Sequence, residues 1–376
     1  MRIDRDIYVG GRSWQERLPL PPKALAALAA AVVVFVVAVL VVPSLFGKPE
    51  EATLPDLDAA DKEAPAPPAD AAPAETGGLT ADEASAALRA LEAAPSDFGI
   101  SLFTEQGAER TVDPSELPAV QEALAAFNAE GYEASFVIYD LDTGRGLCRN
   151  IDADYFSAST IKAPFVAYLD DDLIDEGKAN KDDLIYEDVT VEGTGIMADD
   201  DEDTYPLETV IYNTIVHSDN TGYALLRESY ADGGFEAWAE RTGVAATEWE
   251  GEEYPFFSAR DLAQLWVGVG SYLGTDAACV PWCAELLSQS SNSFIREAVG
   301  ASAARVLSKP GFEMDTPLFD MGSLNDAGIV VTEGDDYLIA LMSDADFDDE
   351  FMPDHGGKLT ALAAALMDAC DQLLHA

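Results

Sequence analysis

The sequence predicts an α/β (α+β) fold: an antiparallel sheet flanked by helices, with an inserted all-helical region and one preceding transmembrane helix. Three observations lead to this prediction. Short runs of strand-like apolar residues occur at 135–149 and again from residue 304 onward. The residues between, about 158–300, have mostly helical spacing, and a long apolar run precedes the whole pattern. The chain is therefore expected to leave one sheet and later rejoin it.

The N-terminal apolar run predicts a membrane anchor. Ala24–Val42 contains 19 consecutive apolar residues, which span roughly 28 Å as a helix and can cross the hydrocarbon core. A cleaved signal peptide is the alternative, but the run is long for one and no small-residue cleavage site follows at once. Basic residues in 1–23 place that segment in the cytoplasm. We expect a single-pass protein of the cell membrane, anchored by 24–46, with an extracellular C-terminal part.

Two further segments precede the main domain. Residues 47–79 form an acidic, Pro/Ala-rich linker, because a stretch with six prolines and few large apolar residues cannot bury a core. Residues 80–112 form a small N-terminal extension, in which Thr80 and Glu83 fit a capping box that opens a helix to about Ala93. We assign no chemistry to either segment.

Residues 113–376 have the pattern of a globular domain. Pro114 opens a helix, and a β-hairpin follows with its turn at 142–144. Further strands are expected at 304–308, 328–332 and 337–343. An amphipathic helix closes the chain, with one apolar face made of Leu359, Leu362, Leu366, Cys370 and Leu373.

Charge and histidine content exclude several classes of function. The chain has 21 Lys and Arg against 70 Asp and Glu, a net charge of −49, which repels nucleic acid and anionic membrane surfaces. The histidines His217, His355 and His375 lack ligand spacing with any cysteine, so structural or surface roles are expected for them. We expect no nucleic-acid partner, no metal site and no cofactor.

Ser159-Thr160-Ile161-Lys162 is the first motif with possible chemistry. It begins an apolar helical stretch, and a helix N-terminus favours developing negative charge on a serine oxygen. Lys162 lies on the same helical face as Ser159, so its amine can reach that oxygen. If burial and a nearby cation keep this amine neutral, it can take the serine proton.

Ser218-Asp219-Asn220 is the second motif, at the end of a helix that Pro206 begins. Composition gives this triplet only about 0.04 times by chance. Ser218 can bridge two lysines and pass a proton to a leaving group, while the Asn220 amide can bind a substrate carbonyl or Lys162. A plain helix end followed by an N-cap is the alternative.

Lys309-Pro310-Gly311 is the third motif and ends the predicted strand 304–308. A glycine on an edge strand lets substrate lie against the backbone. The Lys309 ammonium can attract a carboxylate and lower the pKa of neighbouring bases. The K-x-G pattern alone is common.

In this order, the three motifs resemble the S-x-x-K, S-D-N and K-T-G set of class A β-lactamases and penicillin-binding proteins. The resemblance covers about 113–376, including the stretch 325–330, and implies a β-lactamase/transpeptidase-like fold with a serine hydrolase site. Ser159 would be the acylated nucleophile, Lys162 its base and Ser218 the proton relay. Backbone N–H groups of Ser159 and Phe312 would form the oxyanion hole. The implied substrate-binding residues are Asn220, Lys309, Gly311 and Phe312.

Two departures from the family pattern matter. Pro310 stands where the family has Thr or Ser, so it offers no hydroxyl or N–H to a substrate carboxylate. The class A motif E-x-x-L-N, whose Glu activates the deacylating water, does not occur in this chain. One of the four glutamates in the segment 247–254 is the candidate replacement.

The four cysteines fit an exported domain. In the fold implied by the resemblance the last helix packs on the sheet that carries Cys148, so we favour Cys148–Cys370 and Cys279–Cys283 among the three possible disulfide pairings.

The sequence therefore predicts a membrane-anchored extracellular serine hydrolase that forms an acyl-enzyme on a β-lactam or a peptidoglycan peptide amide. A true β-lactamase with fast turnover is one alternative. A catalytically inactive domain that binds wall peptides or scaffolds partners is another, favoured by Pro310 and the missing glutamate motif.

Overall fold

The computed structural model describes residues 81–91, 99–230, 233–249, 251–303, 305–316, 321–347 and 353–375. The predicted cytoplasmic segment, anchor and linker lie outside these residues. Among the helices that the structure describes, none is long and apolar enough to cross a membrane.

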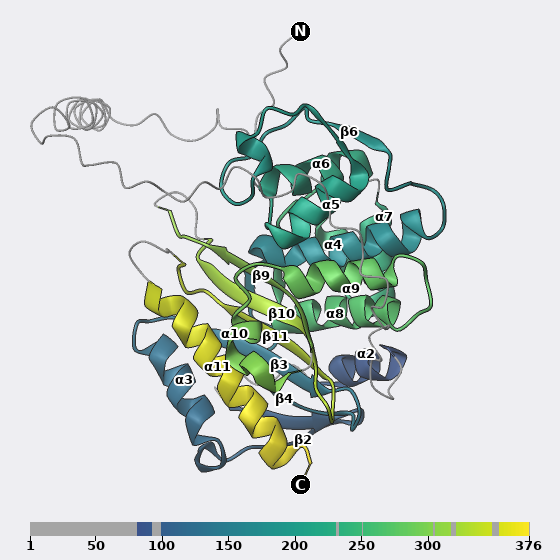
Figure 1. Cartoon of the computed structure of the whole chain (residues 1–376). Helices are drawn as coiled ribbons and strands as arrows, with labels where there is room; N and C mark the ends of the chain where they lie inside the picture. Colours follow the sequence, from purple (N-terminus) through teal and green to yellow (C-terminus); the bar gives the residue numbers. More distant parts are fainter. Residues whose placement is uncertain are drawn as a thin grey trace, which may run out of the picture. The chain divides into compact units, whose positions relative to one another are not determined.

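A seven-stranded antiparallel sheet forms the centre of the described region (Figure 1). Its strand order is β2-β1-β4-β3-β11-β10-β9, so the chain leaves the sheet after β4 and rejoins it at β9, as predicted. The strands are β1 Ser101–Thr104, β2 Gly107–Thr111, β3 Ala134–Asp140, β4 Arg145–Arg149, β9 Arg305–Glu313, β10 Ser323–Val331 and β11 Tyr337–Ser343.

Helices cover both faces of the sheet (Figure 1). One face packs against α3 (Pro118–Asn128), α10 (Phe294–Val299) and α11 (Pro353–Leu373). The other packs against α8 (Ala259–Leu273), which also contacts α2 (Ala81–Ala90). Side chains along β3 point alternately to the two faces. Phe136 and Ile138 belong to the core on the α11 side, while Val137 and Tyr139 belong to the core on the α8 side.

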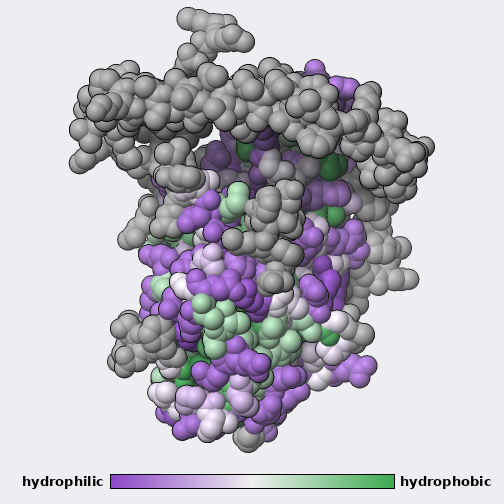
Figure 2. All heavy atoms as spheres, turned by 90° about the vertical axis from the view of Figure 1, so that its left-hand side faces the viewer, coloured by the Kyte–Doolittle hydropathy of each residue, from purple (hydrophilic) through white to green (hydrophobic). Residues whose placement is uncertain are grey.

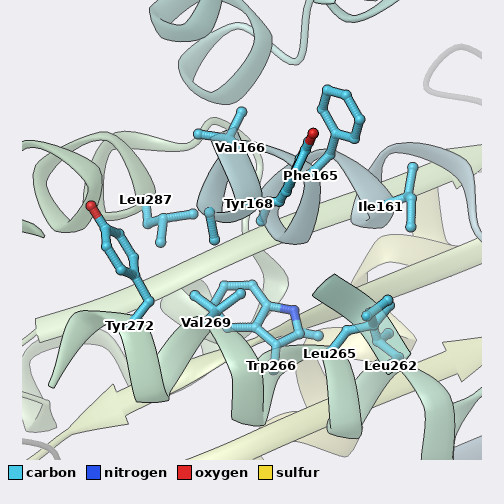
Figure 3. Packing of buried hydrophobic residues seen from close by; sticks show 14 of the residues in the cluster. Ile161, Phe165, Val166, Tyr168, Leu262, Leu265, Trp266, Val269, Tyr272 and Leu287 are labelled. Carbon is cyan, nitrogen blue, oxygen red and sulfur yellow. The ribbon is translucent and has the colours of Figure 1, made fainter. Parts of the chain in front are cut away.

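The inserted region is helical, as predicted, with two small two-stranded sheets, β5–β8 and β6–β7. Its helices are α4 Lys162–Tyr168, α5 Leu207–Val216, α6 Asn220–Tyr230, α7 Gly234–Thr242 and α9 Val280–Gln289. Its short strands are β5 Asp154–Phe156, β6 Leu184–Tyr186, β7 Thr204–Pro206 and β8 Phe256–Ser258. Figure 3 shows α4 above α8, with Trp266 and Val269 of α8 pointing toward α4. The rings of Phe165 and Tyr168 extend to the other side of α4, where both contact Phe235 of α7. α4 is therefore packed between α8 and the other inserted helices.

Two sheet features differ from the sequence prediction. The extension contains β1 and β2, which join the edge of the sheet beside β4. Alternation in such short, half-exposed strands is too weak to read. β9 runs on through Pro310 to Glu313 instead of ending near residue 308. It is an edge strand, where a proline without an N–H is tolerated.

The predicted disulfides are wrong: all four cysteines are free thiols. Cys148 points into the core on the α8 face of the sheet, whereas Cys370 of α11 lies in the core on the opposite face. Cys283 is one helical turn beyond Cys279, and both thiols are buried.

The face shown in Figure 2 is predominantly polar, because hydrophilic side chains predominate among its coloured atoms. This agrees with the large excess of Asp and Glu.

Candidate active site

Ser159 lies in the 3₁₀ turn η4 (Ala158–Ile161), which leads directly into α4. Ala158 has φ of 42°, in the left-handed region that non-glycine residues rarely adopt. Thr160 Oγ1 donates to the Ser157 carbonyl at 2.6 Å and holds the turn. Ser159 makes no side-chain hydrogen bond with another described residue, and it lines a cavity of about 740 Å³. Its hydroxyl is therefore available to a molecule in that cavity.

Gly311 of β9 lies directly against this turn. A Cβ at position 311 would lie 2.5 Å from Thr160 N and 2.7 Å from Ser159 N, so only glycine fits. The close approach brings the backbone of Ser159 beside the backbone that continues to Phe312. Such proximity is what the predicted oxyanion hole requires.

Asn325 of β10 holds the segment before the turn from below. It is fully buried, and its Nδ2 donates to the Phe156 carbonyl at 2.9 Å, while its Oδ1 accepts from Ser343 N at 3.2 Å. Its side chain therefore ties the nucleophile turn to the sheet. The sequence analysis placed Asn325 in a family-like stretch and gave it no function.

Lys162 is fully buried beside the cavity. Its Nζ donates to the Ser218 carbonyl and to Asn220 Oδ1, both at 2.7 Å. Burial, together with the positive charge of Lys309, holds the pKa of Lys162 well below its usual value, although Asp219 opposes the shift. The structure thus provides the lowered basicity that the sequence predicted. A direct hydrogen bond from Lys162 to Ser159 is not among those of the described residues.

Ser218 contacts both lysines through different atoms. Its carbonyl accepts from Lys162, and its Oγ accepts from Lys309 Nζ at 2.9 Å. The residue has φ of 54°, so the left-handed bend after α5 turns its side chain and carbonyl toward the two amines. Because Lys309 is the donor in that bond, the Ser218 hydroxyl hydrogen is free to be given to a substrate atom.

Lys309 differs from the prediction in its accessibility. It is fully buried, it also donates to the Pro310 carbonyl at 2.9 Å, and burial lowers its pKa to about 7 while Asp326 opposes that shift. Its ammonium is occupied inside the protein. With Pro310 lacking a hydroxyl, a substrate carboxylate has fewer donors here than the three-motif resemblance implied.

A glycine-containing loop completes one side of the cavity. Asp219 Oδ2 accepts from Ile196 N at 2.6 Å and from Met197 N at 2.8 Å, which draws this loop onto the second motif. At Gly195, with φ of 115°, a Cβ would lie 2.2 Å from that carboxylate oxygen. The sequence analysis missed the loop, although its two glycines at 193 and 195 signal a sharp turn.

Asn220 is the meeting point of several groups. Besides Lys162, its Oδ1 accepts from Tyr254 Oη and Thr194 Oγ1, each at 3.3 Å, and its Nδ2 donates to the Glu192 carbonyl at 3.2 Å. One Nδ2 hydrogen remains for a substrate carbonyl.

Tyr254 is a site residue that the sequence analysis missed. It lines the cavity, its ring centroid is 5.8 Å from Lys162 Nζ, and it packs against Phe156 and Tyr223. Burial raises the pKa of Tyr254 well above its usual value, so it remains a neutral phenol. Only its place in the acidic loop could have drawn attention to it.

The described glutamates of the segment 247–254 do not line the cavity. Glu252 and Glu253 are exposed and do not line it; the side chains of Glu248 and Glu250 are outside the described residues. Two other carboxylates, Glu192 and Glu313, line the cavity as exposed residues. Neither side chain hydrogen-bonds to Ser159, to either lysine or to Ser218 among the described contacts.

The sequence profile of the Beta-lactamase enzyme family matches residues 118–368. The chain belongs to this family of serine hydrolases. No curated protein sequence matches the chain. The matched residues include all three motifs.

Solved structures share the fold. PBP-A is 20% identical, with a TM-score of 0.56 over 68% of this chain and 97% of its own. The β-lactamase from Sphaerobacter thermophilus is also 20% identical, with a TM-score of 0.54 over 70% of this chain and 97% of its own. A class A β-lactamase from Clostridium kluyveri is 19% identical, with a TM-score of 0.54 over 69% of this chain and 100% of its own. These likenesses confirm the predicted β-lactamase-like fold.

Proposed function

We propose that this chain is a membrane-anchored, extracellular serine hydrolase that forms a long-lived acyl-enzyme at Ser159 with a β-lactam or a peptidoglycan peptide amide. The observation that carries the proposal is the buried group around Ser218, where one amine contacts the carbonyl and the other contacts Oγ. Two buried lysines beside one cavity cost desolvation energy, which a domain that only binds peptides has no reason to spend.

The acylation step follows from these contacts. Ser159 Oγ attacks the amide carbonyl carbon, and the neutral form of Lys162, which its lowered pKa favours, takes the serine proton. The developing oxyanion accepts hydrogen bonds from the backbone N–H groups of Ser159 and Phe312. As the C–N bond breaks, Ser218 gives its hydroxyl proton to the leaving nitrogen and is reprotonated through the lysines. The net result is an ester at Ser159 and a free amine.

Slow hydrolysis is the second part of the proposal. A water molecule that attacks the ester needs a base within about one hydrogen bond. Tyr254, a neutral phenol, lines the cavity from the loop where the family's glutamate is missing, and the described glutamates of that loop do not line it. A mutant of PBP-A was solved as an acyl-enzyme complex with penicillin G, so this fold holds such an adduct.

Covalent labelling tests the proposed nucleophile. Purified full-length protein is incubated with a fluorescent penicillin, and we expect one labelled species that Ser159→Ala abolishes. Ser115→Ala, which removes an exposed hydroxyl that bonds only locally to Asp113, should label like the wild type. If Ser159→Ala still labels, the nucleophile is elsewhere. If neither protein reacts with any β-lactam or D-Ala-D-Ala ester, the inactive binding domain becomes the better hypothesis.

Membrane topology is a separate part of the proposal and rests on the apolar run Ala24–Val42 with its basic N-terminal flank. Protease added to intact cells should remove the domain after Lys48 and leave residues 1–23 protected. Protection of the large domain would reverse the topology.

A further inference from the structure

Three potential metal ligands meet at the end of the sheet where the chain terminates, near the mark C in Figure 1. Asp140 ends β3, Asp335 lies in the turn between β10 and β11, and His375 follows α11. One oxygen or nitrogen atom of each lies within 4.8 Å of those of the other two. None of the three lines the cavity of Ser159.

Asp140 supplies an unusual buried acceptor. Its side chain is fully buried, and Oδ1 accepts from the N–H groups of Asp142 and Thr143 at 2.8 and 2.9 Å. Oδ2 is also buried, yet no described residue donates a hydrogen bond to it. A buried carboxylate oxygen without a donor is costly. This oxygen faces His375, whose Nε2 is 3.2 Å away without hydrogen-bond geometry.

The separations suit a shared cation. Two ligands bound to one zinc ion at about 2.0–2.2 Å in a tetrahedron lie about 3.4 Å apart. Asp140 Oδ2 and His375 Nε2 are 3.2 Å apart, and Asp335 Oδ2 lies 3.5 Å from the other ring nitrogen, Nδ1. One ring nitrogen of His375 lies within 4.8 Å of an oxygen of each carboxylate, which is the spacing that a shared ion needs.

The three ligands are held in place by their surroundings. The Tyr337 hydroxyl lies 3.1 Å from His375 Nε2, and the two rings are nearly parallel. Thr332 Oγ1 accepts from Asp335 N at 3.0 Å and donates to its carbonyl at 2.6 Å. Arg145 donates to the Leu374 carbonyl at 2.6 Å, which fixes the chain just before His375. Ordering these groups for a metal therefore costs little.

The local charge also favours a cation. Asp142 and Asp336 stand beside the cluster, joined by a hydrogen bond from Asp336 N to Asp142 Oδ2 at 2.9 Å. Arg145 is the neighbouring permanent cation, and it is engaged with Leu374 and, at 3.9 Å, with Glu109.

We propose that Asp140, Asp335 and His375 bind a divalent transition-metal ion of the Zn²⁺ or Mn²⁺ type. Two carboxylates with one imidazole suit these ions better than Mg²⁺ or Ca²⁺, which take oxygen ligands. The ion ties the end of α11 to β3 and the β10–β11 turn. The sequence predicted no metal site, because no histidine has ligand spacing with a cysteine. The ligands proposed here come from three distant parts of the chain and meet only after folding.

Calorimetric titration tests the site. Full-length protein freed of metal by a chelator is titrated with ZnCl₂ at pH 7.5, and the melting temperature is measured with and without the ion. We expect one tight site and a higher melting temperature with zinc. His375→Ala and Asp335→Asn should each weaken that site at least about tenfold. His375 is exposed at the end of the chain, so its removal should leave the fold and the Ser159 labelling unchanged.

A matched control separates a built site from attraction to an acidic surface. Asp371→Asn removes one exposed negative charge on α11 without removing a ligand, so zinc affinity should stay within about twofold of the wild type. The proposal fails if Asp371→Asn weakens binding as much as Asp335→Asn does. It also fails if no tight zinc site is found.

Discussion

The cavity of Ser159 has two walls that are built differently. On the sheet side, the turn η4, strand β9 and the second motif are joined by buried hydrogen bonds, and both lysine amines are fully enclosed. On the loop side, Tyr254 lies against Phe156 and Tyr223 through ring contacts, and the described glutamates of the same loop do not line the cavity.

This difference separates the two halves of a hydrolytic reaction. In the proposed mechanism, the sheet side supplies the nucleophile, a base of lowered pKa, a proton relay and close backbone N–H groups, which are the parts that form an ester. On the loop side, Tyr254 lines the cavity as a neutral phenol, and the described glutamates of that loop do not line it. We therefore propose that this site keeps acylation while losing fast deacylation.

The largest effect on the sheet side is expected from Lys162. Lys162→Ala removes the base and should slow labelling by about 10²-fold or more. The second-order rate of fluorescent penicillin labelling measures this, with circular dichroism confirming the fold. Equal labelling rates in the variant and the wild type would show that Lys162 is not the base. The sheet side would then lack the acylation machinery that we assign to it.

Lys309 should have a smaller effect and a distinct pH signature. Burial lowers its pKa from 10.5 to about 7, so between these values the unfolded chain binds more protons than the folded one. The free energy of unfolding therefore gains from this residue as pH rises through that window, with a slope of at most about 1.4 kcal/mol per pH unit. Urea unfolding at several pH values between 7 and 10 should show a smaller slope in Lys309→Met.

The same variant also tests the proton relay. Lys309→Met takes away the donor to Ser218 Oγ, so we expect labelling to slow by about tenfold. An unchanged pH slope would show that Lys309 keeps an ordinary pKa, and unchanged labelling would show that Ser218 needs no second lysine.

The smallest effect is expected on the loop side. Tyr254→Phe keeps the ring contacts and removes one hydrogen bond to Asn220, so labelling should slow by about twofold to fivefold. The adduct lifetime should not change, because the phenol is not a base for water. The lifetime is measured by removing free penicillin and following the labelled protein over time. A shorter adduct lifetime in Tyr254→Phe would contradict our claim that the phenol plays no part in hydrolysis.

Much of the fold could be predicted because its elements follow from local sequence patterns. The hairpin β3–β4, strand β11 and the apolar face of α11 follow from alternation or helical spacing, and the structure confirms them. The face of the sheet on which a residue lies depends on distant segments, however. Nothing in the sequence shows that Cys148 and Cys370 lie on opposite sides of the sheet, which is why the disulfide prediction was wrong.

The site divides in the same way. The three motifs named Ser159, Ser218 and the two lysines because each short motif carries its own spacing, and the structure brings them together. Tyr254 and Asn325 act through contacts between distant segments. Residues of that kind carry no motif, so only the folded arrangement identifies them.

The lifetime of the acyl-enzyme is the most direct test of the central claim. Full-length protein is exposed briefly to penicillin G, free antibiotic is removed, and intact-protein mass spectrometry follows the adduct while nitrocefin hydrolysis is measured in parallel. We predict an adduct on Ser159 that persists for minutes to hours, with poor turnover of nitrocefin. Rapid turnover with no accumulating adduct would contradict this account and establish a true β-lactamase in which a carboxylate of the cavity or the loop activates water.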